Sequence, residues 1–197
     1  MKKIGVFGGT FDPVHIGHIE KSDEALLKLD LDSVLWVVSG EPWMKTGRPI
    51  SAARHRVEMV KIAISGKADM EVSDIEITRG GPSHTVDTLL QLNKAYPENE
   101  LTLLVGSDLI KKFDQWKSIN TVLSLAKLAI FVRTENEIDL GNVQRLHPDA
   151  NERISVLRGE IIEVTSSRIR ELASRNESIS PYVPKGIENY IIENKLY

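Results

Sequence analysis

The amino-acid sequence predicts an α/β fold built on an open parallel sheet with helices on both faces. Short β-branched runs alternate along the chain with longer segments of helical periodicity, a pattern typical of parallel strands joined by crossover helices. With 197 residues, 41% of them hydrophobic, the chain can bury one full core but is too short for two. We therefore expect a single domain over residues 1–197.

Runs of β-branched residues define the expected strands, and apolar residues at i, i+3 and i+4 define the expected helices. The strands are expected at Ile4–Phe7, Val34–Ser39, Glu71–Ile77, Leu101–Val105, Leu128–Val132 and Ile161–Val164. The helices are expected at Gly17–Leu29, Ala52–Ile64, Val86–Lys94, Ile119–Leu125 and, after a proline that suits a helix start, Lys185–Asn194. In open parallel sheets, ligands bind at the carboxyl ends of the strands, so the loops that leave those ends should hold the functional residues.

Two stretches have no clear periodicity. Residues 40–50 contain Gly, Pro and Lys directly after a predicted strand, so we expect a mobile substrate loop there. Residues 134–153 are polar and are expected to be a surface excursion rather than a linker between domains.

The composition excludes several classes of function. Lys and Arg number 25 against 28 Asp and Glu, so the net charge of -3 gives no basic footprint for a nucleic-acid backbone. Cysteine is absent, which removes disulfides, thiolate zinc sites and a cysteine nucleophile. The sequence shows neither a signal-peptide pattern nor an apolar window of membrane-spanning length. We therefore expect a cytoplasmic protein with no nucleic-acid partner and no membrane association.

The strongest local signal lies near the N-terminus, where a strand, a glycine turn and a helix start follow one another. The stretch is Gly5-Val6-Phe7-Gly8-Gly9-Thr10-Phe11-Asp12-Pro13-Val14-His15-Ile16-Gly17-His18. Adjacent glycines let the backbone approach an anion, and the amides and dipole of the following helix favour negative charge. Neither the G-x-x-x-x-G-K-[ST] nor the G-x-G-x-x-G pattern occurs. The stretch therefore predicts a phosphate site of another kind.

His15 and His18 are spaced so that both can face this loop. The alternative is that one caps the helix and the other is a surface residue. Phosphate contact is favoured because two histidines flank Gly17 directly after the glycine turn. A metal site formed by the histidines is the weaker interpretation, since no third ligand stands at suitable spacing.

This stretch resembles the histidine-x-glycine-histidine motif of the nucleotidyltransferase superfamily, and residues 8–13 are similar to its nicotinate-nucleotide adenylyltransferase branch. The resemblance implies a Rossmann-like sheet of the nucleotidyltransferase type and transfer of the adenylyl group of ATP to nicotinate mononucleotide in NAD biosynthesis. The acceptor phosphate would attack the α-phosphorus in line, without an enzyme nucleophile. Mg²⁺ is expected as the companion of the ATP phosphates. By this resemblance, the ATP phosphates would contact His15, His18, Gly8, Gly9, Thr10, Phe11 and Gly17.

A second strand-to-helix junction near the C-terminus carries hydroxyl residues. Taken alone, Thr165, Ser166 and Ser167 predict a well-capped helix. The run is similar to the family's three hydroxyls followed by x-x-Arg, which implies contacts with the β- and γ-phosphates of ATP. Arg170 then becomes the third catalytic residue beside the two histidines, because its planar fork suits phosphate oxygens.

The middle of the chain resembles the acceptor-binding part of the same branch. Residues 82–89 are similar to its Pro-Ser-Tyr-Thr-x-x-Thr-Leu run, which implies that Ser83, His84 and Thr85 recognise the nicotinate carboxylate, although tyrosine is usual where His84 stands. Without the resemblance, Thr85 would be interpreted only as the N-cap of a helix. The later Gly-x-Asp and Trp-Lys elements imply an ATP contact at Gly106, acceptor contacts at Asp108, and a pyridine platform at Trp116.

Several further residues extend the resemblance across nearly the whole chain. Lys45 fits the family's phosphate-facing lysine, although Trp43-Met44 replaces the usual Pro-His, and Arg133 is expected near the acceptor at the end of a strand. His55-Arg56 and residues 183–197, which close on Leu196-Tyr197, are also similar to the family.

Three alternatives stay open at this level. Pantetheine-phosphate adenylyltransferases and cytidylyltransferases share the first motif but leave residues 83–89 and 108–116 unexplained. Class I aminoacyl-tRNA synthetases carry a similar histidine string but are far longer. A nucleotide-binding sensor without turnover is disfavoured by retention of both histidines and Arg170. The sequence does not fix the oligomeric state, so a homo-oligomer stays open.

Overall fold

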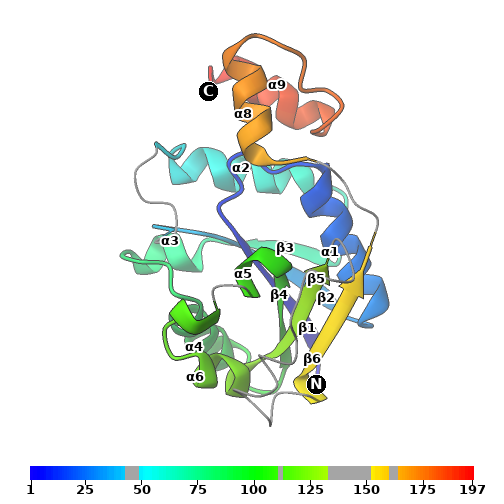
Figure 1. Cartoon of the computed structure of the whole chain (residues 1–197), viewed down its shortest axis with the longest axis vertical. Helices are drawn as coiled ribbons and strands as arrows, with labels where there is room; N and C mark the ends of the chain where they lie inside the picture. Colours follow the sequence, from blue (N-terminus) through cyan, green and yellow to red (C-terminus); the bar gives the residue numbers. More distant parts are fainter. Residues whose placement is uncertain (43–48, 111–112, 133–151, 160–163) are drawn as a thin grey trace.

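The structure is a computed structural model that describes residues 1–42, 49–110, 113–132, 152–159 and 164–197 (Figure 1). Its centre is a six-stranded sheet of order β3-β2-β1-β4-β5-β6, in which every neighbouring pair is parallel. The strands are β1 (Lys3–Gly9), β2 (Ser33–Val38), β3 (Met70–Ser73), β4 (Glu100–Gly106), β5 (Lys127–Val132) and β6 (Ile154–Arg158). The α/β fold with an open parallel sheet is confirmed.

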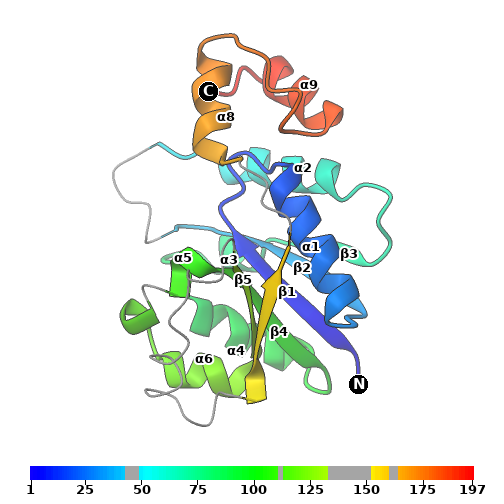
Figure 2. The same ribbon diagram turned by 45° about the vertical axis from the view of Figure 1, so that its right-hand side comes forward.

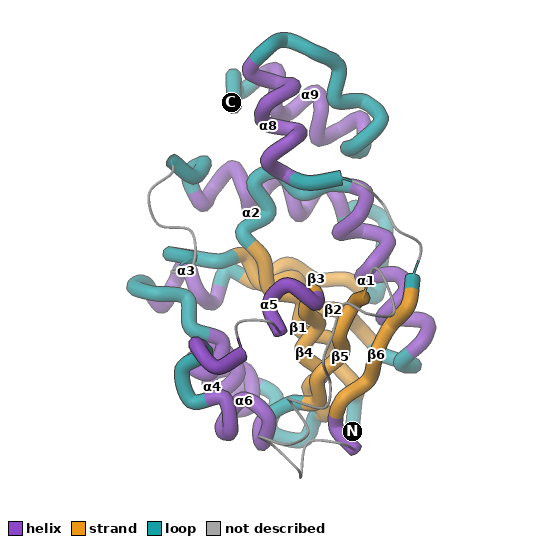
Figure 3. The backbone as a smooth tube through the Cα atoms, in the orientation of Figure 1, coloured by secondary structure: helices purple, strands orange, loops and turns teal. Residues whose placement is uncertain are grey.

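Helices cover both faces of this sheet (Figure 3). One face packs against α1 (Ile16–Lys28) and α2 (Ala53–Ala63), and α8 (Ser166–Ser174) and α9 (Lys185–Glu193) add side chains to the same hydrophobic cluster. The other packs against α4 (Thr85–Ala95), α5 (Ser107–Ile110) and α6 (Ile119–Leu125). The short elements α3 (Ile75–Arg79) and η2 (Phe113–Gln115) complete the described helices. In Figure 2, α8 and α9 lie beyond α2, on the side away from α4 and α6.

Alternation along the strands explains the two layers. In β1, Phe7 points into the layer of α1 and α2, whereas Val6 points into the layer of α4 and α6. Both side chains are buried because successive residues of a strand face opposite sides of the sheet. A parallel sheet covered on both faces therefore requires continuous apolar runs, and the buried run Val34–Val38 of β2 is an example.

The strand order places the carboxyl ends of β1 and β4 at the point where the chain reverses its direction of winding. From β1 the chain proceeds outward through β2 to β3, and then it returns to β4 on the other side of β1. The register pairs Phe7 with Leu104, so the residues that follow β1 and β4 emerge side by side. Loops at such a switch point form the usual ligand crevice of open α/β sheets.

Five predicted helices and four predicted strands are confirmed, with ends within a few residues of those expected. The prediction of a strand over Glu71–Ile77 was too long. β3 ends at Ser73 because it pairs with β2 only as far as Val37, and the chain then turns into α3 with Thr78 N–H donating to the Asp74 carbonyl at 2.8 Å.

The sixth strand of the sheet, Ile154–Arg158, was not predicted. It pairs with β5 from Leu128 to Val132 and buries Leu157. Of the predicted Ile161–Val164, residues 161–163 lie outside the described part of the chain and Val164 lies in a loop. The run 154–158 is short, and its pairing with β5 is what identifies it as a strand.

Among the described residues, no helix is both long enough and apolar enough to cross a membrane.

Candidate active site

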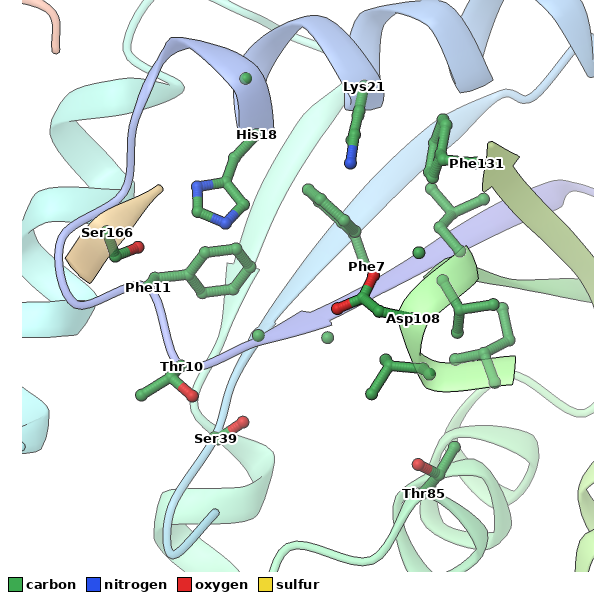
Figure 4. Close-up of a pocket in the computed structure, with 18 of the residues that line it drawn as sticks. Phe7, Thr10, Phe11, His18, Lys21, Ser39, Thr85, Asp108, Phe131 and Ser166 are labelled. Atoms are coloured by element: carbon green, nitrogen blue, oxygen red, sulfur yellow. The ribbon is translucent and has the colours of Figure 1, made fainter. Parts of the chain in front are cut away.

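A pocket of about 840 Å³ opens at the carboxyl ends of β1 and β4 (Figure 4). Its wall brings together three segments that are far apart in the sequence: the loop after β1, the turn before α4 and the start of α8. The predicted site residues that line it are Gly8, Gly9, Thr10, Phe11, His15, Gly17, His18, Ser83, His84, Thr85, Gly106, Asp108, Trp116, Thr165, Ser166 and Ser167. The fold thus unites the two halves of the predicted site.

The loop after β1 is shaped by close packing. A Cβ on Gly9 would lie 2.7 Å from the ring of Phe11, and one on Gly17 would lie 3.2 Å from Val164 and 3.3 Å from His15 Nδ1. Phe11 adopts a left-handed backbone conformation with φ of 50°, which is uncommon for a bulky residue. Its ring is 2% exposed and packs edge-on against His18 at a centroid distance of 5.2 Å, so the strained turn supports this histidine.

The two histidines form one unit at the start of α1. Their rings stack at a centroid distance of 3.7 Å, and His15 occupies the N-cap position. The backbone N–H of His15 donates to Nδ1 of His18 at 3.2 Å. Since Nδ1 accepts, a neutral His18 carries its proton on Nε2. The capping role considered from the sequence is therefore present, and it orients His18 in the pocket wall (Figure 4).

Burial makes His15 a neutral group. It is only 8% exposed, and desolvation, assisted by the charge of Lys21, lowers its pKa from 6.5 to about 4. A neutral imidazole can exchange hydrogen bonds with a phosphate but supplies no positive charge to it. Positive charge in this wall must therefore come from other groups.

Lys21 is one such group, and sequence reasoning missed it. It stands three residues after His18 on α1, so both side chains project into the pocket from one face of the helix (Figure 4). Its Nζ lies 5.6 Å from the ring centroid of Phe131, a cation–π distance. The helical spacing from His18 was the available signal.

The start of α8 attaches to the loop after β1. Thr165 caps the helix, its hydroxyl accepting from the N–H of Arg168 at 3.2 Å, as the capping interpretation predicted. Ser166 Oγ donates to the carbonyl of Pro13 at 2.8 Å.

Arg170 donates to the carbonyl of Asp12 at 2.6 Å and to Ser167 Oγ at 3.1 Å. Arg170 is not among the described residues that line the pocket, so the structure places it behind the loop.

On the acceptor side, backbone geometry is set by Ser83. Its Oγ accepts from the amides of Gly40 and Glu41 at 2.9 and 3.2 Å, and its own N–H donates to the carbonyl of Glu41 at 2.9 Å. His84 takes the N-cap position of α4 and Thr85 is its first helical residue. The first amides of a helix have no acceptor within the helix, and Thr85 faces the pocket (Figure 4).

Glu76 also lines the pocket on this side, although it belongs to no motif that was recognised in the sequence. Its carboxylate is 7% exposed and accepts from the hydroxyl of Thr88 at 2.6 Å. Arg79 donates to the same hydroxyl at 3.1 Å. These contacts fix α4 against α3.

Asp108 and Trp116 follow β4 on the opposite wall. Asp108 lies two residues after Gly106, the last residue of β4. A Cβ on Gly106 would lie 2.7 Å from a carboxylate oxygen of Asp108. Trp116 is half-buried, packs at 5.2 Å from the ring of Phe113, and still lines the pocket. Its buried Nε1 has no hydrogen-bond partner within the described ranges. The side chain is thus partly core and partly pocket wall.

Two predicted site residues, Lys45 and Arg133, lie outside the described residues. In the part of the chain that the structure describes, no three His, Asp or Glu side chains gather as a metal-ligand cluster.

Comparison with known proteins follows this geometry. Residues 6–172 match the family model described as cytidylyltransferase-like. A probable nicotinate-nucleotide adenylyltransferase of Clostridium novyi is 37% identical and covers the whole of both chains. One from Thermomicrobium roseum is 34% identical over all of this chain and 92% of its own length. This chain belongs to the nicotinate-nucleotide adenylyltransferase family.

Solved structures agree with this adenylyltransferase fold. The nicotinic acid mononucleotide adenylyltransferase of Plasmodium falciparum, in its complex with NaAD, superposes with a TM-score of 0.82 at 20% identity, covering 100% of this chain and 98% of the other. A putative nicotinate-nucleotide adenylyltransferase of Vibrio parahaemolyticus gives a TM-score of 0.69 at 22% identity, covering 100% and 96%. At these identities the likeness extends the Rossmann-like, nucleotidyltransferase-type fold to this chain.

We predict that His18→Ala lowers kcat by about 10²-fold or more, because an oriented donor to the transferred phosphate is lost. The measurement is steady-state pyrophosphate release by the purified variant, with its thermal unfolding recorded in parallel. Near-normal turnover by a folded variant would reduce His18 to its capping role.

A second prediction concerns pH and stability. The unfolded chain protonates His15 near pH 6.5, whereas the folded chain does so only near pH 4. Protonation thus favours unfolding, and the stabilisation present above the unfolded pKa is lost as the pH falls towards the folded one. His15→Gln should therefore lose less unfolding free energy than the wild type between about pH 7 and about pH 5, measured by urea denaturation. Parallel losses in the two proteins would contradict a buried neutral His15.

Proposed function

We propose that this enzyme transfers the adenylyl group of ATP to nicotinate mononucleotide, giving nicotinate adenine dinucleotide and pyrophosphate in NAD biosynthesis. The observation that carries the proposal is that one pocket holds both the loop of residues 8–18 and the turn of residues 83–85. Relatives over the full chain length support it, since those compared carry the name nicotinate-nucleotide adenylyltransferase at 33–37% identity. The Plasmodium enzyme of the same fold has been solved in complexes with APC and with NaAD.

The chemistry is an in-line displacement at the α-phosphorus. A phosphate oxygen of the acceptor forms a bond to this phosphorus, and the bond to the bridging oxygen of the leaving pyrophosphate breaks. The enzyme contributes position and charge stabilisation rather than a nucleophile.

We assign the nucleotide half of this reaction to the start of α1. The amide of Ile16 donates to the carbonyl of Tyr182 and that of His18 to the carbonyl of His15, so the Gly17 amide and Nε2–H of His18 are the donors assigned to phosphate oxygens. Lys21, which lines the same wall, supplies positive charge that the neutral His15 does not. Arg170 acts from behind the loop, where it holds the carbonyl of Asp12.

We assign the acceptor half to the turn before α4 and to the wall after β4. The amides of Thr85 and Val86, at the N-terminus of α4, are placed to receive the pyridine carboxylate. Trp116 offers its ring as the pyridine platform and Asp108 faces the pocket between the two halves (Figure 4).

Mg²⁺ enters this proposal with ATP. Its hard charge prefers phosphate and water oxygens and needs few protein ligands, and the carboxylate of Asp108 lies in the wall of the same pocket as the phosphate loop. The ion would neutralise charge on the leaving pyrophosphate. The cytoplasm, where its substrate ATP is abundant, is the proposed location.

A panel of acceptors tests the function. Purified enzyme with ATP or CTP and Mg²⁺ is given nicotinate mononucleotide, nicotinamide mononucleotide, phosphopantetheine or glycerol 3-phosphate, and pyrophosphate release is measured. Turnover is expected with ATP and nicotinate mononucleotide. Release only with phosphopantetheine, or only with CTP, would move the enzyme to another branch of the superfamily.

We predict that kcat/KM for the nicotinate form exceeds that for the nicotinamide form by about one to two decades at saturating ATP. A carboxylate accepts from the amides at the start of α4, whereas the NH₂ of an amide would face donors. Unpaired donors in a closed pocket cost roughly 1 to 3 kcal/mol, which at about 1.4 kcal/mol per decade gives this range. Equal values, or a preference for nicotinamide, would contradict the assignment of this turn.

A further inference from the structure

Arg56 is a buried cation that the proposed chemistry does not use. It lies on α2, is 2% exposed, and is not among the described residues lining the pocket. Burial lowers its pKa, and the neighbouring charge of Asp12 is the main influence that raises it again. An arginine kept in such a place needs a reason, because taking its charge out of water is costly unless hydrogen bonds compensate.

Its guanidinium is occupied by backbone carbonyls from three segments. Nη1 donates to the carbonyl of Thr10 at 3.0 Å and to that of Ser39 at 2.7 Å. Nε donates to the carbonyl of Ser51 at 3.0 Å, and Nη2 to that of Gly40 at 3.4 Å. One planar fork thus joins the loop after β1 to the end of β2 and to the entry of α2.

The end of β2 is in turn joined to the acceptor turn. The amide of Gly40, whose carbonyl Arg56 holds, donates to Ser83 Oγ at 2.9 Å. A Cβ on Gly40 would lie 2.7 Å from the carbonyl of Glu76, so this segment packs directly on α3. A continuous path therefore runs from Thr10 through Arg56 and Gly40 to Ser83.

The two ends of this path belong to different halves of the pocket. Thr10 lies in the loop assigned to ATP, and Ser83 lies in the turn assigned to the acceptor. In-line transfer requires the attacking oxygen and the α-phosphorus to meet within a narrow distance and angle. A shift of one half against the other would spoil this alignment while leaving each half able to bind its own substrate.

We propose that Arg56 is a positioning residue that holds the ATP half and the acceptor half of the site in register for the transfer step. The inference rests on the proposed function. It assigns to Arg56 no contact with either substrate, so its effect appears in kcat and not in the two KM values.

Arg56→Lys tests this role while keeping the charge. Lysine has one compact ammonium and cannot span four carbonyls as the planar fork does. We expect kcat to fall by about 10²-fold, the cost of a small misplacement of reacting groups, with KM for ATP and for nicotinate mononucleotide unchanged. Arg54→Lys, at an exposed position on the same helix, is the matched control and should leave all three constants unchanged.

Ser83→Ala cuts the same path at its other end and completes a double-mutant cycle. If both residues act through one path, kcat of the double variant should be little lower than kcat of the more impaired single variant. If the two residues act independently, the two fold-losses in kcat should multiply. Far-UV circular dichroism and thermal unfolding establish that each variant is folded. Should Arg56→Lys fail to fold, Ser83→Ala alone must lower kcat with KM for ATP unchanged.

Three results would overturn the inference: normal kcat in a folded Arg56→Lys, a rise in either KM that accounts for the loss, or multiplying effects in the double variant. Normal kcat in Ser83→Ala, where that variant carries the test alone, would do the same. Failure of the proposed function is distinguishable, since the wild-type enzyme would then release no pyrophosphate with nicotinate mononucleotide.

Discussion

The parallel pairing of β1 with both β2 and β4 is the constraint on which the site depends. Because β1 is central, the loop that leaves it is flanked on one side by the end of β2 and on the other by the end of β4. The loop after β1, the turn before α4 held by the end of β2, and Asp108 after β4 are thereby gathered without any long excursion of the chain. Burial of Phe7 and Val6 on opposite faces fixes this strand in the sheet, so core packing also positions the chemistry.

Electrostatics explains why the loop after β1 needs a fixed backbone geometry. With a net charge of -3, the protein as a whole does not attract a triphosphate, and the attraction has to be local. The stacked histidines are not a pair of cations, since burial keeps His15 neutral. In the proposed function, backbone donors and the helix dipole therefore have to supply much of the complementarity, and Lys21 adds charge at one wall. Amides are effective only in a fixed geometry, and this is what Phe11 and the contacts of Ser166 and Arg170 with the loop provide.

Much of the fold and of the site was predictable from residues that act locally. Glycine turns, helix periodicity and β-branched runs gave all the long helices except α8, whose start alone was predicted, and four strands close to their observed ends. Where pairing between distant segments decides the outcome, local patterns failed. The strand at residues 154–158 was not predicted, because its pairing with β5 is what identifies it. Likewise Glu71–Ile77 contains three β-branched residues, but β2 offers partners for its first part only.

Two buried side chains have contacts that the sequence does not reveal. The resemblance includes the positions of Arg56 and Tyr197, but their partners are backbone carbonyls and another buried side chain, which no motif predicts. Tyr197 donates to the carboxylate of Asp12 at 2.7 Å across 185 residues of sequence, and burial together with that carboxylate raises the pKa of its hydroxyl. No spacing rule could link the two positions.

The same distinction explains how the acceptor turn retains its form with His84 in place of the family's usual tyrosine. The shape of the turn depends on Ser83, whose hydroxyl and amide bind the segment after β2, and on the N-terminal amides of α4. Position 84 contributes its backbone as the N-cap, and its carbonyl accepts from the amides of Asp87 and Thr88 at 3.1 and 3.3 Å. A change of side chain there alters the lining of the pocket but not the direction of the amides. Recognition of a carboxylate by backbone donors therefore tolerates variation at this position better than recognition by a side chain would.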